Sequence, residues 1–501
     1  MIRRIGVILV WLVIHVPASY AQTAPVVWVI GSMERVGRFA EPGTDADITL
    51  YAARGEYEAF QIAVQGELAA VRLTISDLRS DDHAVISAQH VQLYQEHYVE
   101  VQEGSPNWGG SNQPLGPGWY ADALIPLDLE PVDVPAGENL PFWVDIEVPR
   151  DAAPGTYHGI YRITSAKGEA AGSITLHVWD FELPLRPSMY SSFLFQYPAR
   201  LADKIELLKH KVMPAQIDPS EQQMLIEEWG LNAVNLGYWS GADVSTCAMD
   251  QPLPSAAELE DAVLSYSADL LIYNLTADEI DRCITELTPT LAEWAQHLHA
   301  AGVLQLVTLT PTPELYERSL VDIWVLLPVM YDAAVEPVAD VMANGNQVWF
   351  YTAQTQDDYS PKWEIDFAPI NYRIPGMIMQ SLGMTGMLYW AVDWWIGDPW
   401  SEPLYRADDG TAFPGEGVLV YPGEAVGIDH VVPSLRLKWI REGVEDYEYV
   451  ALLKQLADPD EVLSIIAAAG SDWANWTQDP QVLETVRRDL GDRIEEAQKQ
   501  E

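Results

Sequence analysis

From residue 191 onward, the chain repeats one pattern, in which a short apolar run is followed by a stretch with apolar residues at helical spacing. Apolar strands that alternate with helices are typical of a parallel sheet covered on both faces. Eight such units in roughly 250 residues match a closed barrel. We therefore predict a (β/α)8 TIM-type barrel over residues 187–456. Its strands are expected at 191–197, 233–239, 270–275, 304–309, 322–327, 347–352, 387–392 and 418–423.

Helical spacing is nearly absent from residues 25–185, where short alternating runs are separated by turn-forming Gly and Pro residues. The segments 57–65 (YEAFQIAVQ) and 141–148 (PFWVDIEV) show this pattern. It predicts an antiparallel β-sandwich, joined to the barrel by the Pro-punctuated linker 182–188. Helical spacing returns beyond the barrel, so a C-terminal helical extension is expected over residues 457–501.

The first 21 residues have the pattern of a secretory signal peptide. Arg3 and Arg4 precede the apolar run 5–16, and small residues up to Ala21 resemble a cleavage site. We expect cleavage near Ala21 and a secreted or periplasmic protein. No later apolar run is long enough to cross a membrane, so no membrane span is expected in the mature chain.

Two cysteines, Cys247 and Cys283, are the only ones in the chain. An exported protein can form disulfides, but a sequence does not give the distance between two thiols. A single bridge and two buried free thiols are both open at this point.

With 74 acidic and 28 basic residues, the chain has a formal net charge of −46. Nucleic acids and anionic membranes require basic patches on a protein, so neither is expected as a partner. The sequence also lacks the phosphate-binding loop, the G-x-S-x-G elbow, H-E-x-x-H and CxxC. No cofactor and no metal are therefore expected, and the oligomeric state is left open.

Carboxylates and aromatic side chains gather at the ends of the predicted barrel strands. Sugar rings stack on Trp and Tyr, whose polar edges also form hydrogen bonds, so this composition points to a carbohydrate substrate. For a single Trp, core packing is the simpler interpretation, but the run 389–400 has more Trp and Asp than a core needs. The candidates are Trp239, Trp324, Tyr351, Trp363, Tyr389, Trp390, Asp393, Trp394, Trp395, Asp398 and Trp400.

The segment 270–283 (LLIYNLTADEIDRC) delivers two adjacent acids, Asp278 and Glu279, shortly after an apolar strand. Neighbours in a strand point to opposite faces, so both can face the barrel mouth only if the chain has already bent. Adjacent acids raise each other's pKa, which suits a general acid. An alternative is structural, because Thr276–Glu279 fits the T-x-x-E capping box of a following helix.

Several segments resemble glycoside hydrolase family 123 and a large group of related bacterial proteins. The segments are 141–159 (PFWVDIEVPRDAAPGTYHG), 388–400 (LYWAVDWWIGDPW), 415–423 (GEGVLVYPG) and 433–453 (PSLRLKWIREGVEDYEYVALL). The resemblance implies an exo-acting β-N-acetylgalactosaminidase, in which the substrate's own 2-acetamido oxygen attacks the anomeric carbon.

By that resemblance Glu279 is the general acid/base, and Asp278 orients the acetamido group. The residues chosen by type and position as substrate contacts are Trp239, Tyr351, Trp363, Tyr389, Trp390, Asp393 and Trp395. Relatives often carry Pro at the position of Ile280 and Asn at that of Asp393. Two alternatives therefore stay open, namely a glycosidase for another sugar that uses Asp393 or Asp398, and an inactive glycan-binding protein.

Overall fold

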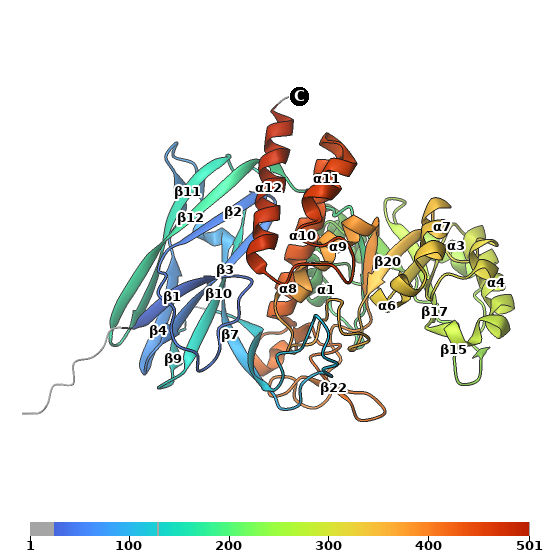
Figure 1. Cartoon of the computed structure of the whole chain (residues 1–501), viewed down its shortest axis with the longest axis horizontal. Coiled ribbons are helices and arrows are strands. Elements are labelled where there is room, and N and C mark those ends of the chain that lie inside the picture. The colour runs from blue at the N-terminus through green and yellow to red at the C-terminus, as the bar shows by residue number, and fades with distance from the viewer. Residues whose placement is uncertain (1–24, 128–129, 500–501) are drawn as a thin grey trace, which may run out of the picture.

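The computed structural model describes residues 25–127 and 130–499 (Figure 1). The predicted signal peptide, residues 1–21, lies outside this part, so export stays a prediction. Within the described ranges, no helix has both the length and the apolar character needed to cross a membrane.

Two β-sheets form the N-terminal domain and share one hydrophobic core. The first has the order β1 (Val26–Gly31), β3 (Tyr57–Gln65), β10 (Asn139–Glu147), β7 (Val91–Val101) and β8 (Gly118–Pro126). The second has the order β2 (Ile48–Arg54), β12 (Gly168–Glu182), β11 (Gly155–Ser165), β4 (Leu68–Ile75) and β9 (Val132–Val134), with β5 (Leu78–Ser80) and β6 (Val85–Ile86) beside it.

The strand pairs are antiparallel as predicted, except for β2 and β12, which run parallel in the register Ile48 to Ile174. A chain segment that enters a sheet from a distant loop can pair in either direction, so local alternation does not reveal this exception.

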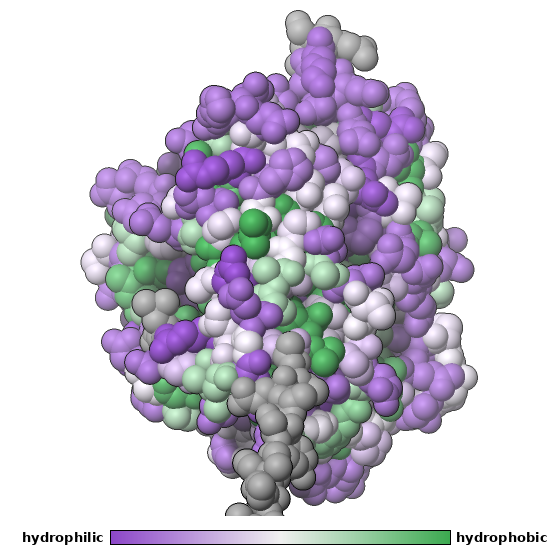
Figure 2. All heavy atoms as spheres, turned by 90° about the vertical axis from the view of Figure 1, so that its left-hand side faces the viewer, coloured by the Kyte–Doolittle hydropathy of each residue, from purple (hydrophilic) through white to green (hydrophobic). Residues whose placement is uncertain are grey.

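On the face that Figure 2 shows, hydrophilic residues surround smaller apolar groups.

The C-terminal domain contains a nearly closed barrel, in which the described residues form seven parallel strands. Their order is β13 (Tyr190–Phe193), β21 (Gly386–Tyr389), β20 (Gln347–Tyr351), β19 (Ile323–Leu326), β18 (Leu304–Thr308), β17 (Leu271–Asp278) and β14 (Ala233–Asn235). The prediction of eight barrel strands is wrong at 418–423. There, β24 (Val420–Tyr421) pairs antiparallel with β25 (Val432–Pro433) instead of entering the barrel.

Residues 213–215 occupy the place between β13 and β14. The Phe193 amide donates to Met213 O at 2.9 Å, and the Ala215 amide donates to Phe193 O at 2.9 Å. On the other side, the Asn235 amide donates to Ala215 O at 2.8 Å. Pro214 has no amide hydrogen, so this segment cannot form a regular ladder. Sequence periodicity places it in a helix, whereas α1 ends at Lys209.

Helices cover the outside of the barrel and separate it from the sandwich (Figure 1). They are α1 (Leu201–Lys209), α2 (Gln222–Trp229), α3 (Ala256–Leu264), α4 (Ile284–Ala300), α5 (Pro313–Tyr316), α6 (Pro328–Ala333), α7 (Val335–Ala343), α8 (Ile370–Arg373), α9 (Pro375–Leu382), α10 (Leu435–Leu456), α11 (Pro459–Ile466) and α12 (Pro480–Gln498). The predicted helical end of the chain is thus observed as α11 and α12.

Helix α10 lies between the two domains and is buried along most of its length. Three of its cations, Arg436, Lys438 and Arg441, are buried as well and pair with carboxylates of the sandwich. Arg441 donates to Asp145 at 2.6 and 2.9 Å, and Lys438 donates to the same carboxylate at 2.8 Å. Burial alone would raise the pKa of Asp145, but the two cations hold it well below its ordinary value.

Replacing Asp145 with Asn would leave Arg441 and Lys438 buried without their counter-ion. Breaking a buried ion pair costs about 3–5 kcal/mol, so the free energy of unfolding in urea should fall by about that amount. Glu461→Gln is the control, because the Glu461 and Arg493 side chains are 62% and 42% exposed, and such pairs contribute about 0–1 kcal/mol. Equal losses in both variants would contradict this role of Asp145.

Candidate active site

The candidate site lies where the parallel barrel strands end. Strand β17 ends at Asp278, β18 at Thr308 and β20 at Tyr351, so these side chains meet at the carboxyl-terminal mouth of the barrel. This is the end at which TIM-type barrels hold their reactive groups, because the βα loops converge there.

The acid pair spans the point where β17 stops. Asp278 is the last residue of the strand and pairs with Thr308 of β18, after an irregularity between Leu275 and Ala277. Glu279 follows in the left-handed region, with φ 46° and ψ 43°. This conformation costs a residue other than Gly about 1–2 kcal/mol, and such strain is often found at functional sites. The chain therefore bends at Glu279, and only this acid lies past the strand. The expectation that the chain has bent before both acids is wrong for Asp278, which is the last residue of β17.

Thr308 contacts both acids. Its hydroxyl donates a very short hydrogen bond to Asp278 Oδ1 and accepts one from the Glu279 amide at 2.8 Å. The Glu279 amide also donates to Thr308 O at 2.9 Å. One side chain from the neighbouring strand thus fixes the carboxylate of Asp278 and the turn that presents Glu279.

The capping-box alternative is wrong. Thr276 is buried inside β17, where its hydroxyl lies 3.4 Å from Asn274 O. Glu279 precedes the short 3-10 helix Ile280–Cys283, and no side chain caps that helix. The Glu279 carboxylate instead accepts a hydrogen bond from the Tyr351 hydroxyl at 2.7 Å. It therefore points across the barrel mouth towards β20.

The surroundings change the acidity of two groups in the site. Asp278 remains accessible to solvent, yet the protein around it removes water and raises the pKa of its carboxyl. The Thr308 hydrogen bond lowers this pKa, and the charge of Glu279 raises it further. Burial, followed by the charge of Glu279, raises the pKa of Tyr351 well above its usual value. Tyr351 is therefore a neutral hydrogen-bond donor to Glu279.

A cavity of about 390 Å³ opens at the same mouth beside β13 and β14. Trp239 lines it and is 43% exposed, as a platform for a sugar ring requires. Tyr197 also lines the cavity and stacks on Trp395 with ring centres 5.7 Å apart. Among the other residues that form its wall are Leu194, Gln216, Asn235 and Leu275.

Trp363 and Tyr389 are predicted as substrate contacts, but the structure buries both side chains. Trp363 is 1% exposed and packs against Phe193 and Phe350, and Tyr389 is fully buried. Both rings pack in the core beneath the mouth, where large aromatic side chains bury much apolar surface. For Trp363, core packing, which is the simpler interpretation of a single Trp, is therefore correct.

Asp393 and Asp398 use their carboxylates to hold the backbone. Asp393 is 2% exposed and accepts from the Gln196 and Tyr197 amides at 2.7 and 3.2 Å. Asp398 accepts from the Trp400 amide at 3.1 Å and from the Ser401 hydroxyl at 2.5 Å. The burial of Asp393 and its two hydrogen bonds to backbone amides disfavour a glycosidase built on this residue.

Two family models match the chain. The glycoside hydrolase 123 catalytic domain matches residues 302–453, and the glycoside hydrolase 123 N-terminal domain matches residues 40–165. The chain belongs to glycoside hydrolase family 123. This confirms the resemblance seen in the sequence, and the coarse activity is that of a glycosidase. The acid pair precedes the matched catalytic range, so its assignment rests on the geometry above.

A solved family 123 glycoside hydrolase from Clostridium perfringens has the same fold, with a TM-score of 0.69 at 12% identity over 95% of this chain and 98% of that chain. A putative β-galactosidase from Bacteroides fragilis is 9% identical over 83% of this chain and 60% of that chain, with a TM-score of 0.31. A putative α-galactosidase from the same organism is 9% identical over 68% and 72%, with a TM-score of 0.24. No curated protein matches the chain.

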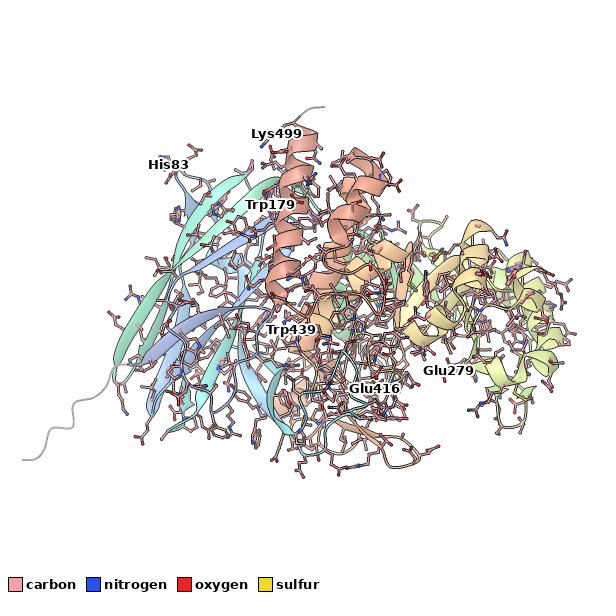
Figure 3. All side chains as sticks on the ribbon, in the orientation of Figure 1. His83, Trp179, Glu279, Glu416, Trp439 and Lys499 are labelled. Carbon is pink, nitrogen blue, oxygen red and sulfur yellow. A yellow bond between two sulfur atoms is a disulfide. The ribbon has the colours of Figure 1, made fainter. Side chains whose placement is uncertain are left out.

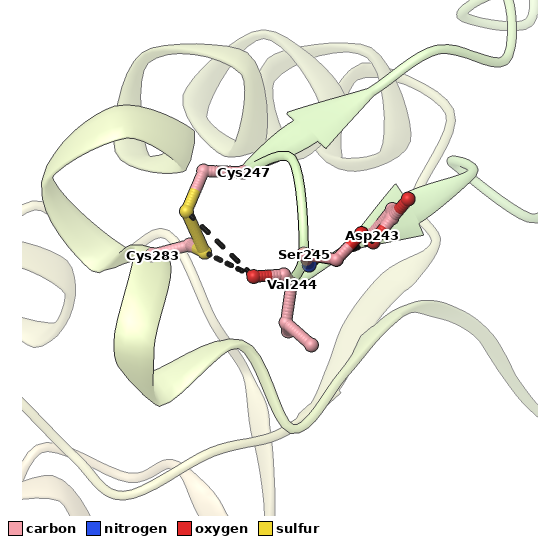
Figure 4. The surroundings of a disulfide bond; sticks show 5 residues. All are labelled: Asp243, Val244, Ser245, Cys247 and Cys283. Carbon is pink, nitrogen blue, oxygen red and sulfur yellow. Dashed lines mark hydrogen bonds between the residues drawn. A yellow bond between two sulfur atoms is a disulfide. The ribbon is translucent and has the colours of Figure 1, made fainter.

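Cys247 and Cys283 form a disulfide in this family 123 chain (Figure 4). The bridge joins the hairpin of β15 (Ala242–Asp243) and β16 (Ala248–Met249) to the short helix that follows Glu279. It therefore ties one wall of the mouth to the segment that carries the acid pair. Among the described residues, no group of three or more His, Cys, Asp or Glu side chains could hold a metal ion.

Sequence reasoning missed Thr308 and Glu416. Thr308 ends an ordinary apolar strand, so no local signal distinguishes it. Glu416 accepts a very short hydrogen bond from the Trp390 indole and another from the Gln354 amide at 3.0 Å. Burial raises the pKa of Glu416 to about 7, although both donors act in the opposite direction. Its position between two glycines, Gly415 and Gly417, was the available signal.

Thr308→Val removes the hydroxyl that stabilises ionised Asp278, so the pKa of Asp278 should rise. We expect the acidic limb of the kcat/KM profile to move to higher pH, since the carboxylate is then protonated at a pH where the parent is still ionised. Thr308→Ser keeps the hydroxyl and serves as the control, with an unchanged limb. A shift to lower pH in the Val variant would contradict the contact.

Proposed function

We propose that this protein is an exported glycosidase that removes a terminal β-linked 2-acetamido sugar, similar to N-acetylgalactosamine, by substrate-assisted retention. The observation that carries the proposal is the pair of adjacent carboxylates, Asp278 and Glu279, at the end of β17. Retaining glycosidases that supply their own nucleophile need two carboxylates on opposite faces of the sugar. Two neighbours in the chain instead suit a reaction whose nucleophile belongs to the substrate.

In the first step, Asp278 accepts a hydrogen bond from the acetamido N–H and turns the acetamido oxygen towards the anomeric carbon. The bond from that carbon to the leaving oxygen breaks as the bond to the acetamido oxygen forms, and Glu279 gives its proton to the leaving oxygen. A cyclic oxazolinium ion results. Its positive charge lies next to the ionised Asp278, which favours it electrostatically.

In the second step, Glu279 takes a proton from water, and the water oxygen attacks the anomeric carbon. The bond to the acetamido oxygen then breaks, and the acetamido group is restored with retained configuration. The Tyr351 hydroxyl, 2.7 Å from Glu279 Oε1, holds the general acid/base in one orientation throughout. Fixing a reacting group in this way lowers the entropic part of the barrier.

Two observations support export. The N-terminal sequence has the pattern of a signal peptide, and the Cys247–Cys283 disulfide is of the kind that persists in oxidising compartments. We propose a secreted or periplasmic location on this basis. The partner that this function implies is a glycan or glycoconjugate.

Glu279→Gln tests the general acid/base. General acid–base catalysis contributes about 10²–10⁴-fold, so kcat/KM on a glycoside with a poor leaving group should fall by about that factor. Binding of the sugar, followed by calorimetry, should be retained. Glu286→Gln, on the exposed first turn of α4, is the control. Unchanged turnover in Glu279→Gln would exclude this role, and an inactive parent that still binds glycans would favour a binding protein.

A panel of chromogenic glycosides tests the acetamido mechanism. We expect turnover of N-acetyl-β-galactosaminide or N-acetyl-β-glucosaminide and inhibition by an N-acetyl thiazoline, which resembles the oxazolinium ion. The corresponding sugars without the 2-acetamido group should be inert, because they lack the nucleophile. Turnover of those sugars at comparable rates would contradict the mechanism.

A further inference from the structure

The loop 415–418 contacts one edge of the indole ring of Trp390 at two points. Glu416, which is 2% exposed, accepts from the indole N–H. A side-chain carbon at Gly417 would lie only 2.7 Å from Trp390 Cζ2, and Gly417 has a φ of 73°. Both the space and the conformation therefore require glycine at this position. The loop is shaped to accept the indole edge in one orientation.

The second oxygen of Glu416 reaches a different loop. It accepts from the Gln354 amide at 3.0 Å, and Gln354 lies three residues beyond Tyr351 with a φ of 55°. A left-handed residue other than Gly needs such external contacts to persist. The Glu416 carboxylate thus joins two loops. One follows Tyr351 at the end of β20, and the other begins with Trp390 after β21.

The loop 415–418 is itself anchored to the core. Arg436 of α10 donates to Gly415 O at 2.8 Å and, through a very short bond, to Val418 O. Arg436 is fully buried and also pairs with Asp122 at 2.8 Å. Figure 3 labels Glu416 and Glu279, and both lie in the lower part of the barrel domain in this view. Glu416 therefore has a rigid base from which to set the geometry of the mouth.

We propose that Glu416 is a positioning residue, which holds the plane of Trp390 at a set place relative to the Tyr351–Glu279 pair and thereby determines affinity for the sugar. The proposal rests on the proposed function, because Trp390 acts here as a platform for the sugar ring. Glu416 itself makes no contact with the reacting atoms.

The test compares the parent, Glu416→Gln, Trp390→Phe and the double variant on one chromogenic 2-acetamido glycoside. A Gln amide has one acceptor oxygen in place of two, so it satisfies either the indole or the Gln354 amide. Leaving a buried donor without its partner is expected to raise KM about tenfold, with kcat within about threefold. Trp390→Phe removes the same bond from the other side, so the double variant should be no worse than the poorer single variant.

Glu424→Gln is the matched control. Glu424 lies in the same region of sequence, and its side chain is 71% exposed. Its Oε1 atom lies 3.7 Å from Arg200 Nη2. We expect its kinetic constants and its near-ultraviolet circular dichroism to equal those of the parent. Glu416→Gln should instead change the aromatic bands, because the environment of Trp390 changes.

Three outcomes would overturn the proposal: a loss confined to kcat in Glu416→Gln, a double variant whose losses multiply, or aromatic bands identical to those of the parent. If the parent hydrolyses no glycoside, the proposed function fails, whereas the aromatic bands still decide whether Glu416 positions Trp390. If Glu416→Gln does not fold, Glu416→Asp takes its place, because a side chain one methylene shorter no longer reaches both the indole and the Gln354 amide. Its KM should rise and its aromatic bands should change, and parent values of both in Glu416→Asp would refute the proposal.

Discussion

The buried ion pairs of α10 are the interaction on which the two domains depend. Asp145 and Asp122 enter from the sandwich, and Arg441, Lys438 and Arg436 enter from the helix. Removing these charges from water is costly, and their attraction offsets the cost only in close geometry, such as the separations of 2.6–2.8 Å seen here. The pairs therefore favour the observed relative placement of sandwich and barrel. A purely apolar surface would tolerate several.

That placement reaches the candidate site through Arg436. The same guanidinium that pairs with Asp122 holds two carbonyls of the loop 415–418, and Glu416 of that loop holds Trp390. A contact between domains is thus connected to the aromatic wall of the mouth by consecutive hydrogen bonds. The sandwich has a structural part in the site although it supplies none of the proposed reacting groups.

At the acid pair, no ion pair within the described part of the chain reaches either carboxylate, and neutral hydroxyl groups hold both. Thr308 stabilises the charge on Asp278, and Tyr351 donates to Glu279. Neutral donors can hold two acids in place without forcing both to ionise, since a hydroxyl has no net charge. A Lys or Arg at either place would favour two carboxylates and remove the proton that a general acid must carry.

By itself, the sequence determined the order of domains, seven of the barrel strands, the location of the acid pair and the family. These depend on local periodicity and on motifs, which report which face of each segment is buried. Only the tertiary structure decided that residues 213–215 complete the barrel, that Trp363 is core, that Cys247 meets Cys283, and that Thr308 and Glu416 contact the site. Each of these is a contact between residues distant in the chain or a question of burial. Local sequence patterns contain no information on such contacts, because the same pattern is compatible with many spatial arrangements of the same helices and strands.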